Sequence, residues 1–313
     1  MAIKHVFVSA KTQGTDATVA SANEWNSNHT IDSEFTVPVV AAPAVPAAGV
    51  NVAAQSVGGR IMLGSQGIAG GLYQFQPHIG RKKRAEWIPN PGDVTITQIG
   101  CFATSSGGTS TGRQPTSTNY FSALRRIGKV SGAIAGNVAG FQDNVGYHCW
   151  RGNGAGLGGF HLVIRFGVSD AVLVGTARMF AGLVSPLVAP SDVDPSTLTN
   201  IVGIGCNNGD TVMQLYMAGA AAQARVSLGA NFPVNTISTD AYELIVFCAP
   251  NGSAESYQVT RLNTGDVASG TISTAANLLA NTQFVSPVIY RSNGGAASAV
   301  SVDLMSMYLE TDA

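Results

Sequence analysis

The sequence predicts an all-β protein: an antiparallel β-sandwich or jelly-roll-like body preceded by an extended N-terminal arm. From about Gly58 onward, short runs of branched and aromatic residues recur between clusters of Gly, Asn, Asp and Pro. Many of these runs alternate with the period of two that a half-buried strand needs. About a dozen strands at this spacing are typical of a sandwich or jelly roll. The clearest runs are 94–102, 160–168, 177–184, 201–206, 211–217, 242–249, 257–262 and 300–309.

The run 211–217 shows the strand pattern most plainly. Met213, Leu215 and Met217 would share one face of a strand, because successive side chains point to opposite faces. Asn-Asn-Gly-Asp at 207–210 stands just before the run and is a signal for a hairpin turn. The local chemistry therefore favours a strand entered through a tight turn.

Helical signals are few. Ser21 followed by Glu24 has the spacing of a capping box, so a short helix is expected to begin within 21–28. Residues 218–225 lie between predicted strands and suit either a helix or a loop. The sequence has no internal repeat of fixed period and no long heptad run, so a coiled-coil stalk is not expected.

Three regions differ in composition. Residues 1–35 are polar and mixed, residues 36–57 are almost entirely Ala, Val, Pro and Gly, and residues 58–313 carry the strand pattern. Prolines at 38, 43 and 46 exclude a continuous helix in the second region and disfavour a central strand. We expect an attachment segment, an extended arm or linker, and a β-sandwich body. An apolar arm is a liability in water, so the arm is expected to pack along a partner chain.

The composition is poor in charge. Only 11% of the 313 residues are charged, against about 25% in an ordinary soluble domain. Self-association, which would cover uncharged surface, is the simplest explanation. The net charge of −1 does not favour nucleic acid. Proline and glycine break the apolar stretch 41–54, which is shorter than the ~20 residues of a membrane span. The first nine residues lack signal-peptide features, so export by the usual route is not expected.

The sequence contains no convincing catalytic or metal-binding motif. Its cysteines, at 101, 149, 206 and 248, form no CxxC or Cys/His metal spacing and are expected to be buried free thiols. Its five histidines show no metal-ligand spacing, and His148 beside Cys149 is a weak candidate for a nucleophile and base. His161 is expected to be an ordinary strand residue. We therefore expect no metal, no cofactor and no enzymatic activity.

Two pairs of acidic residues and one glycine-rich run are weaker candidates for sites. Asp192 and Asp194 stand in turn and cap chemistry, which favours a loop role over calcium binding or catalysis. Asp240 and Glu243 would fall on opposite faces of a strand, so they do not form the carboxylate pair of a glycan hydrolase. The run 152–159 leads into a strand rather than a helix, which favours a loop of close backbone approach over a phosphate site.

One run of charged residues is present. Arg81, Lys82, Lys83 and Arg84 are followed by Trp87. The basic side chains would suit an anionic surface glycan or phosphate, with Trp87 stacking on a sugar ring. The alternative is a solvated loop or an anchor across a subunit boundary, which is the more common role of such a run.

The N-terminal segment carries the most specific pattern. It reads Ser-Ala-Lys at 9–11, Gly-Thr-Asp-Ala-Thr at 14–18 and Trp-Asn-Ser-Asn-His at 25–29. This pattern resembles the opening of tail-associated and fibre-like proteins of tailed bacteriophages. The resemblance implies attachment to other tail proteins of the virion, and Trp25, Asn26 and His29 are the candidate attachment residues.

The body also resembles the globular domains of phage fibre and receptor-binding proteins. The fragments that carry this likeness are 159–167, 178–183, 194–205, 228–233 and 291–295. The resemblance implies a virion protein, assembled in the host cytoplasm, and a homotrimer, since phage fibres are usually trimers. It transfers no functional residue position by position.

Three functions follow as hypotheses. The leading one is a homotrimeric tail fibre or receptor-binding protein that contacts a host surface glycan without catalysis. The first alternative is a purely structural capsid fibre, decoration or tail-tip component. The second is a polysaccharide-degrading tailspike, which the lack of a carboxylate pair and of β-helix repeats disfavours.

Overall fold

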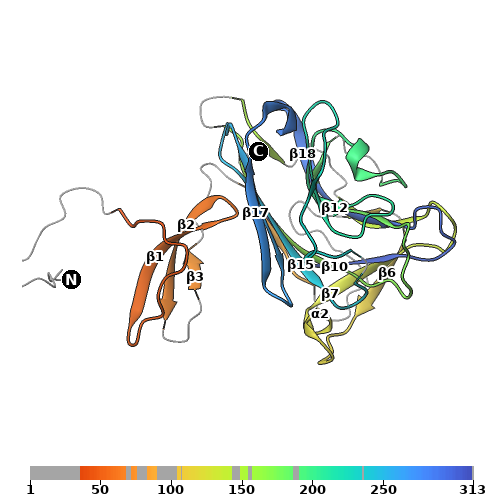
Figure 1. Ribbon diagram of the computed structural model, residues 1–313, viewed down its shortest axis with the longest axis horizontal. Coiled ribbons are helices and arrows are strands. Elements are labelled where there is room, and N and C mark those ends of the chain that lie inside the picture. The colour runs from red at the N-terminus through yellow and green to blue at the C-terminus, as the bar shows by residue number, and fades with distance from the viewer. Residues whose placement is uncertain are drawn as a thin grey trace, which may run out of the picture.

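The computed structural model contains a small N-terminal sheet beside a larger β-sandwich (Figure 1). The structure describes residues 36–67, 72–75, 83–89, 104–106, 108–142, 149–153, 157–185, 190–234 and 236–311. All the pairings between the named strands are antiparallel. The expected fold class, an antiparallel β-sandwich, is confirmed. The predicted strand at 94–102 and the capping box at 21–28 lie outside the described residues.

The small sheet, which we call the meander, has three strands in sequence order. They are β1 (Val50–Val57), β2 (Arg60–Gly67) and β3 (Leu72–Phe75). A turn at Gly58 and Gly59 joins the first two, and both glycines have the positive φ that such a turn requires. The prolines of the expected arm all precede β1, and Val39 pairs with Ala54 beside it. The boundary expected at residue 58 therefore falls within the turn of this hairpin.

The first sheet of the sandwich has eight strands. In spatial order they are β17 (Asp266–Ile272), β16 (Glu255–Arg261), β15 (Ala241–Cys248), β10 (Phe160–Val168), β19 (Ser301–Thr311), β7 (Arg126–Val130) and β6 (Thr109–Arg113), with β4 (Lys83–Trp87) also paired to β19. A short helix, α2 (Tyr120–Ala123), precedes β7, and Asn119 and Ser122 close a capping box around it.

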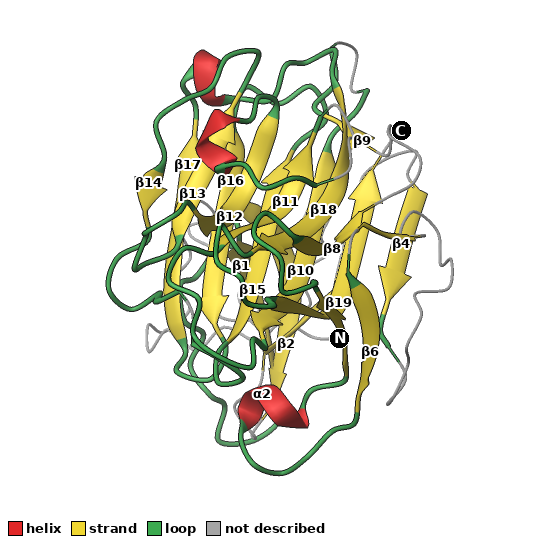
Figure 2. Ribbon diagram, turned by 90° about the vertical axis from the view of Figure 1, so that its right-hand side faces the viewer, coloured by secondary structure: helices red, strands yellow, loops and turns green. Residues whose placement is uncertain are grey.

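The second sheet also has eight strands. In order they are β14 (Val226–Ser227), β13 (Gln214–Ala218), β12 (Ile201–Cys206), β11 (Arg178–Val184), β18 (Phe284–Ser292), β8 (Val138–Gln142) and β5 (Thr104–Ser106), with β9 (Cys149–Trp150) also paired to β18. Two 3₁₀ turns, η1 (Pro195–Thr197) and η2 (Ala275–Asn277), interrupt the loops. The short helices of the sandwich lie beyond the ends of its strands (Figure 2).

The main hydrophobic core lies between the two sheets. Alternate residues of β10, which include Phe160, Leu162 and Ile164, point into it and are at most 1% exposed. Met213, Leu215 and Met217 face the same core, as their spacing predicted. The period of two thus sorts each strand into a core face and an outer face.

The turn of the meander docks on the outer face of the first sheet. A Cβ at Gly59 would overlap Ser256, so only glycine fits there. Arg60 forms an ion pair with Glu310 in which Nη1 and Oε2 are 3.0 Å apart, and both side chains are almost fully buried. Arg60 Nη1 also approaches Nδ1 of His161, on β10. These contacts hold the meander to the body through its tip (Figure 1).

Candidate functional site

The candidate attachment and anion-binding residues are placed only in part. Trp25, Asn26, His29, Arg81 and Lys82 lie outside the described residues. The backbones of Lys83 and Arg84 belong to β4 and pair with Thr311 and Glu310 of β19. Trp87 is 3% exposed and packs in the main core, so we do not retain it as a ring that stacks on a sugar.

A cleft opens at the free edge of the sandwich, where β13 and β14 of the second sheet face β16 and β17 of the first. We call it the edge cleft, and its volume is about 270 Å³. Its lining residues are Leu215, Met217, Val226, Tyr257, Gly270, Thr271, Ile272, Ser273, Thr274 and Asn277. None of these residues carries a charged side chain. Leu215, Met217 and Ile272 extend the core into its floor, and hydroxyl and amide groups stand around it.

Tyr257 is the aromatic residue of the edge cleft. It lies on the core-facing side of β16, directly opposite Gly270 of β17. A Cβ at Gly270 would lie 3.0 Å from the Tyr257 ring, so the ring packs against a position without a side chain. Tyr257 is half-buried, and this burial raises the pKa of its hydroxyl. The hydroxyl therefore stays protonated at neutral pH and can both donate and accept a hydrogen bond.

Backbone hydrogen bonds fix the polar rim of the cleft. The amide of Gly219, just after β13, donates to the carbonyl of Ala276 in η2 at 2.9 Å, which ties the rim to the second sheet. Asn277 ends η2, and its Nδ2 lies 3.8 Å from Sδ of Met217. Ser273 and Thr274 precede η2 and are exposed. The cleft thus offers an amide, several hydroxyls and a tyrosine ring.

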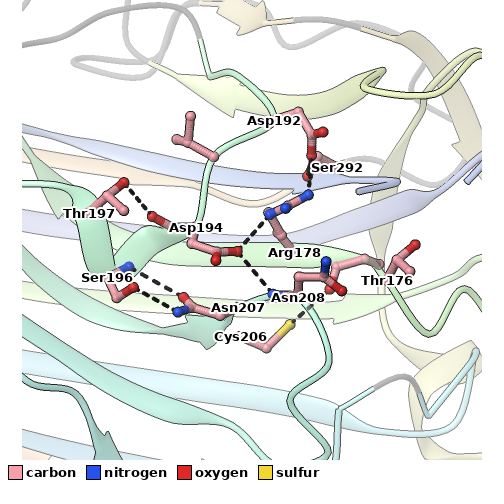
Figure 3. A network of polar contacts seen from close by, with 12 residues as sticks. Thr176, Arg178, Asp192, Asp194, Ser196, Thr197, Cys206, Asn207, Asn208 and Ser292 are labelled. Atoms are coloured by element: carbon pink, nitrogen blue, oxygen red, sulfur yellow. Dashed lines mark hydrogen bonds and ion pairs between the residues drawn. The ribbon is translucent and has the colours of Figure 1, made fainter. Parts of the chain in front are cut away.

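A network of polar contacts on the outer face of the second sheet holds a long loop in place (Figure 3). Arg178 of β11 binds Asp192 at 2.7 Å and Asp194 at 2.6 Å. Burial opposes the charge of Arg178, but hydrogen bonds and the charges of the two carboxylates outweigh it and raise the pKa of Arg178. Asp194 also accepts a hydrogen bond from the amide of Asn208 at 3.0 Å. The two carboxylates therefore fasten the loop, in agreement with the loop role expected from the sequence.

The fastened loop covers a second cavity of about 170 Å³. Phe180, Val288 and Tyr290 form its floor on the sheet, and Val193 and Leu198 close it from the loop. Both rings on the floor are at most 3% exposed, so they cannot present a face to a sugar. We therefore regard this cavity as part of a small outer core, and the edge cleft as the better candidate site.

The other candidate cysteines and acidic residues among the described residues are buried or form ion pairs. Cys206 and Cys248 are buried free thiols, as expected, Cys149 is buried as well, and burial raises the pKa of Cys206 to about 11. Asp240 pairs with Arg261, and Glu243 pairs with Arg165 on the outer face, so the two acids do not act together. Within the described part of the chain, no group of three His, Cys, Asp or Glu residues could hold a metal ion.

Two further expectations concern the backbone. A Cβ at Gly152 would overlap the carbonyl of Leu157, and one at Gly159 would lie 2.6 Å from the nitrogen of Pro250. The close backbone approach expected in the glycine-rich run is therefore present at both ends of its described part. None of the helices among the described residues has the length and apolar character needed to cross a membrane.

The fold defines the class of the protein as an antiparallel β-sandwich with an added β-meander. No protein-family model matches the chain, and no curated protein matches its sequence. A solved structure of peanut lectin with a nine-residue peptide is 13% identical, with a TM-score of 0.44, over 74% of this chain and 97% of the lectin.

Two other solved structures are also similar to this chain. A protein of unknown function from Shewanella oneidensis MR-1 is 14% identical, with a TM-score of 0.47, over 76% of this chain and 90% of its own. The CBM2 module of an evolved Dit protein from Lactobacillus casei BL23 phage J-1 is 12% identical, with a TM-score of 0.41, over 74% of this chain and 98% of the module. No ligand or function is transferred from these proteins to this chain.

Proposed function

We propose that the protein is a non-catalytic, glycan-binding component of a bacteriophage virion, and that the edge cleft holds a neutral sugar. The single observation that carries the glycan proposal is the lining of the cleft. A half-buried tyrosine ring, exposed hydroxyls and one amide surround an apolar floor without any charged side chain. Sugar rings combine apolar C–H faces with hydroxyl groups, so they fit such a lining, which follows the general design of small-molecule sites.

The virion part of the proposal rests on the N-terminal pattern and the fragments of the body that resemble phage fibre proteins. In this proposal residues 1–35 attach to other tail proteins, three copies associate, and the sandwich displays its clefts to the host surface. The three weak glycan sites of one trimer would bind the host surface at the same time and so give high avidity. The protein would then function as a tail fibre or receptor-binding protein on the virion.

The glycan proposal is tested by binding of the full chain to an array of host surface glycans. Tyr257→Ala should weaken binding to any glycan that the wild-type protein binds by about tenfold or more, since truncation of a binding hot spot, a role in which Tyr is common, costs about 2 kcal/mol or more. Tyr120→Ala is the matched control, because Tyr120 is 45% exposed on α2, outside the edge cleft. Equal loss in both variants, or binding that survives Tyr257→Ala, would place the site elsewhere.

The alternatives predict different outcomes. A purely structural virion component would show no glycan binding and no adsorption to host cells, although it would still be found on the particle. A polysaccharide-degrading tailspike would release oligosaccharides from host polysaccharide. A density map of the assembled particle would locate the chain on the tail or the capsid and so separate receptor binding from a scaffolding role.

A further inference from the structure

The meander presents one apolar face to the solvent. In β2, Ile61 is 53% and Leu63 is 40% exposed, whereas Met62 between them is 5% exposed. In β1, Val50 is 64% and Val52 is 57% exposed. The register places Val52 opposite Ser65 and Ala54 opposite Leu63, so these side chains share one face.

The segment that precedes β1 extends this apolar face. Val39 pairs in parallel with Ala54, next to β1, and is 50% exposed. We define the meander face by five residues: Val39, Val50, Val52, Ile61 and Leu63. Five exposed aliphatic side chains gathered on one sheet face differ from the single apolar residues scattered over an ordinary surface.

The meander face is also without charge. Arg60 is the single charged residue in 36–67, and it points to the opposite face of the hairpin from Ile61. Its charge is already used in the buried ion pair with Glu310. Two meander faces can therefore meet without bringing like charges together, which would otherwise oppose association of identical chains.

The position of the meander leaves this face accessible. Among the described residues, the tip of the hairpin contacts the body through Gly58, Gly59 and Arg60. The rest of the meander stands beside the sandwich rather than beneath it (Figure 1). The docked tip fixes the direction of the face, so a second molecule would meet it in a defined orientation.

We propose that the meander face is the surface through which copies of this chain bind one another. A second copy suits it better than the chain's own residues 1–35, because these carry eight of the ionisable side chains, at positions 4, 5, 11, 16, 24, 29, 32 and 34. This inference deepens the association of copies in the proposed function by naming its surface, and it is independent of the edge cleft.

The test compares two substitutions of the same type in the full chain. Ile61→Glu places a charge on the meander face, whereas Ile134→Glu places one on a loop of the body where Ile134 is 72% exposed. By mass photometry, wild type and Ile134→Glu should be oligomers at micromolar concentration. Ile61→Glu should be a single chain, with a dissociation constant raised by about 100-fold or more, because a charge would have to be buried without a partner.

A milder variant, Ile61→Cys, tests the same surface in case Ile61→Glu disrupts the fold of the meander. The thiol introduced by Ile61→Cys should react with a bulky maleimide in the dilute single chain and be protected in the oligomer, after subtraction of the wild-type background. A single-chain wild type, an oligomer unaffected by Ile61→Glu, or an introduced thiol equally reactive at all concentrations would overturn the proposal. Glycan binding by single-chain Ile61→Glu reports on the edge cleft separately, so the two proposals can fail independently.

Discussion

The meander and the sandwich body use charge in opposite ways. In residues 36–67, which include β1 and β2 of the meander, Arg60 is the single charged residue, and aliphatic side chains remain on the surface. In the body, charged groups are buried in pairs that bind segments distant in sequence, such as Arg291 with Asp170 and Arg126 with Asp303. The few charges of the chain are therefore used differently in the two regions: several in the body form buried ion pairs, whereas residues 36–67 carry a single charge.

The largest expected effect is the loss of stability when a buried ion pair of the body is broken. Arg291 and Asp170 are both fully buried, with Nη2 and Oδ2 2.7 Å apart. Arg291→Met should lower the free energy of unfolding by about 3–5 kcal/mol, because it leaves a buried carboxylate without its counterion. Urea denaturation followed by tryptophan fluorescence measures this loss.

The control for this prediction is an exposed pair. Arg165 binds Glu243 at 2.6 Å, but the Arg165 side chain is 46% exposed. Arg165→Met should cost less than about 1 kcal/mol. If both variants lost equal stability, the distinction between buried and surface charge pairs in the body would be wrong.

The next effect is the release of the meander tip from the body by a substitution in the turn. Gly59→Ala should release the docked tip, since its Cβ would overlap Ser256. Gly49→Ala is the matched control, because Gly49 has the same φ of +82° and no atom within 4 Å of the added Cβ. Backbone strain of about 1–2 kcal/mol applies to both variants, whereas the steric overlap adds about 1–3 kcal/mol to Gly59→Ala alone.

Hydrogen exchange of the β1–β2 hairpin measures the docking of the tip. Faster exchange at the tip in Gly59→Ala, with an unchanged body, is the expected result. Equal exchange in the two variants would show that the tip is not held by contact with Ser256.

A smaller effect concerns Glu255, a buried acid in the body that the charge of Arg151 affects but that forms no ion pair within the described part of the chain. Glu255 is fully buried, and Oε1 accepts a hydrogen bond from the amide of Leu279 at 3.0 Å. Burial raises the pKa of Glu255 to about 7 from its ordinary 4.5. The folded state therefore holds a proton that the unfolded state has lost, so stability should fall as pH rises from 4.5 to 7.

Glu255→Gln should remove this pH dependence. At alkaline pH the variant should exceed the wild type by on the order of 1–3 kcal/mol. Thermal unfolding of both proteins across this pH range provides the measurement. A variant with the same pH profile as the wild type would exclude Glu255 as the group responsible.

The smallest effect is a pH dependence of docking. Arg60 donates toward Nδ1 of His161, so the docked state needs a neutral imidazole. Burial and the charge of Arg60 lower the pKa of His161 to about 4, although Glu310 opposes this shift. Docking should therefore be complete above pH 6.5, the ordinary pKa, and weaken as pH falls toward 4.

The change in docking free energy should be about 1–2 kcal/mol. It should be smaller than the full pKa shift implies, because Phe247 and Tyr308 still contact His161 after the tip is released. His161→Gln keeps an acceptor for Arg60 but does not titrate in this range. In that variant, hydrogen exchange of the β1–β2 hairpin should report the same degree of docking across this pH range. A retained pH dependence of docking would point to a different titrating group.

Much of the fold could be predicted from local sequence. The runs 160–168 and 201–206 match β10 and β12 residue for residue, because alternation and turn residues act over a few positions. The strand expected to begin at 211 starts at Gln214 instead, since Met213 donates its amide to Phe232 in the following loop. The meander was not predicted, although the Gly58-Gly59 pair between two apolar runs was a usable hairpin signal.

The candidate site was harder to predict. The edge cleft brings Tyr257 of one sheet near Met217 of the other, and no local pattern reports which strands of two sheets share an edge. Trp87 was considered because it follows a basic run, but β4 turns it into the core. Proximity in sequence to charged residues therefore gave no information on which aromatic ring would line a cleft.

The order of strands has a consequence for synthesis of the protein. In the first sheet β19 lies between β10 on one side and β7 and β4 on the other, and in the second sheet β18 lies between β11 and both β8 and β9. Both strands lie within residues 284–311, after the other described strands in sequence. Neither sheet can join its halves until these residues have been synthesised. Earlier strands must wait with their edges unpaired, a period in which chaperones would be needed most.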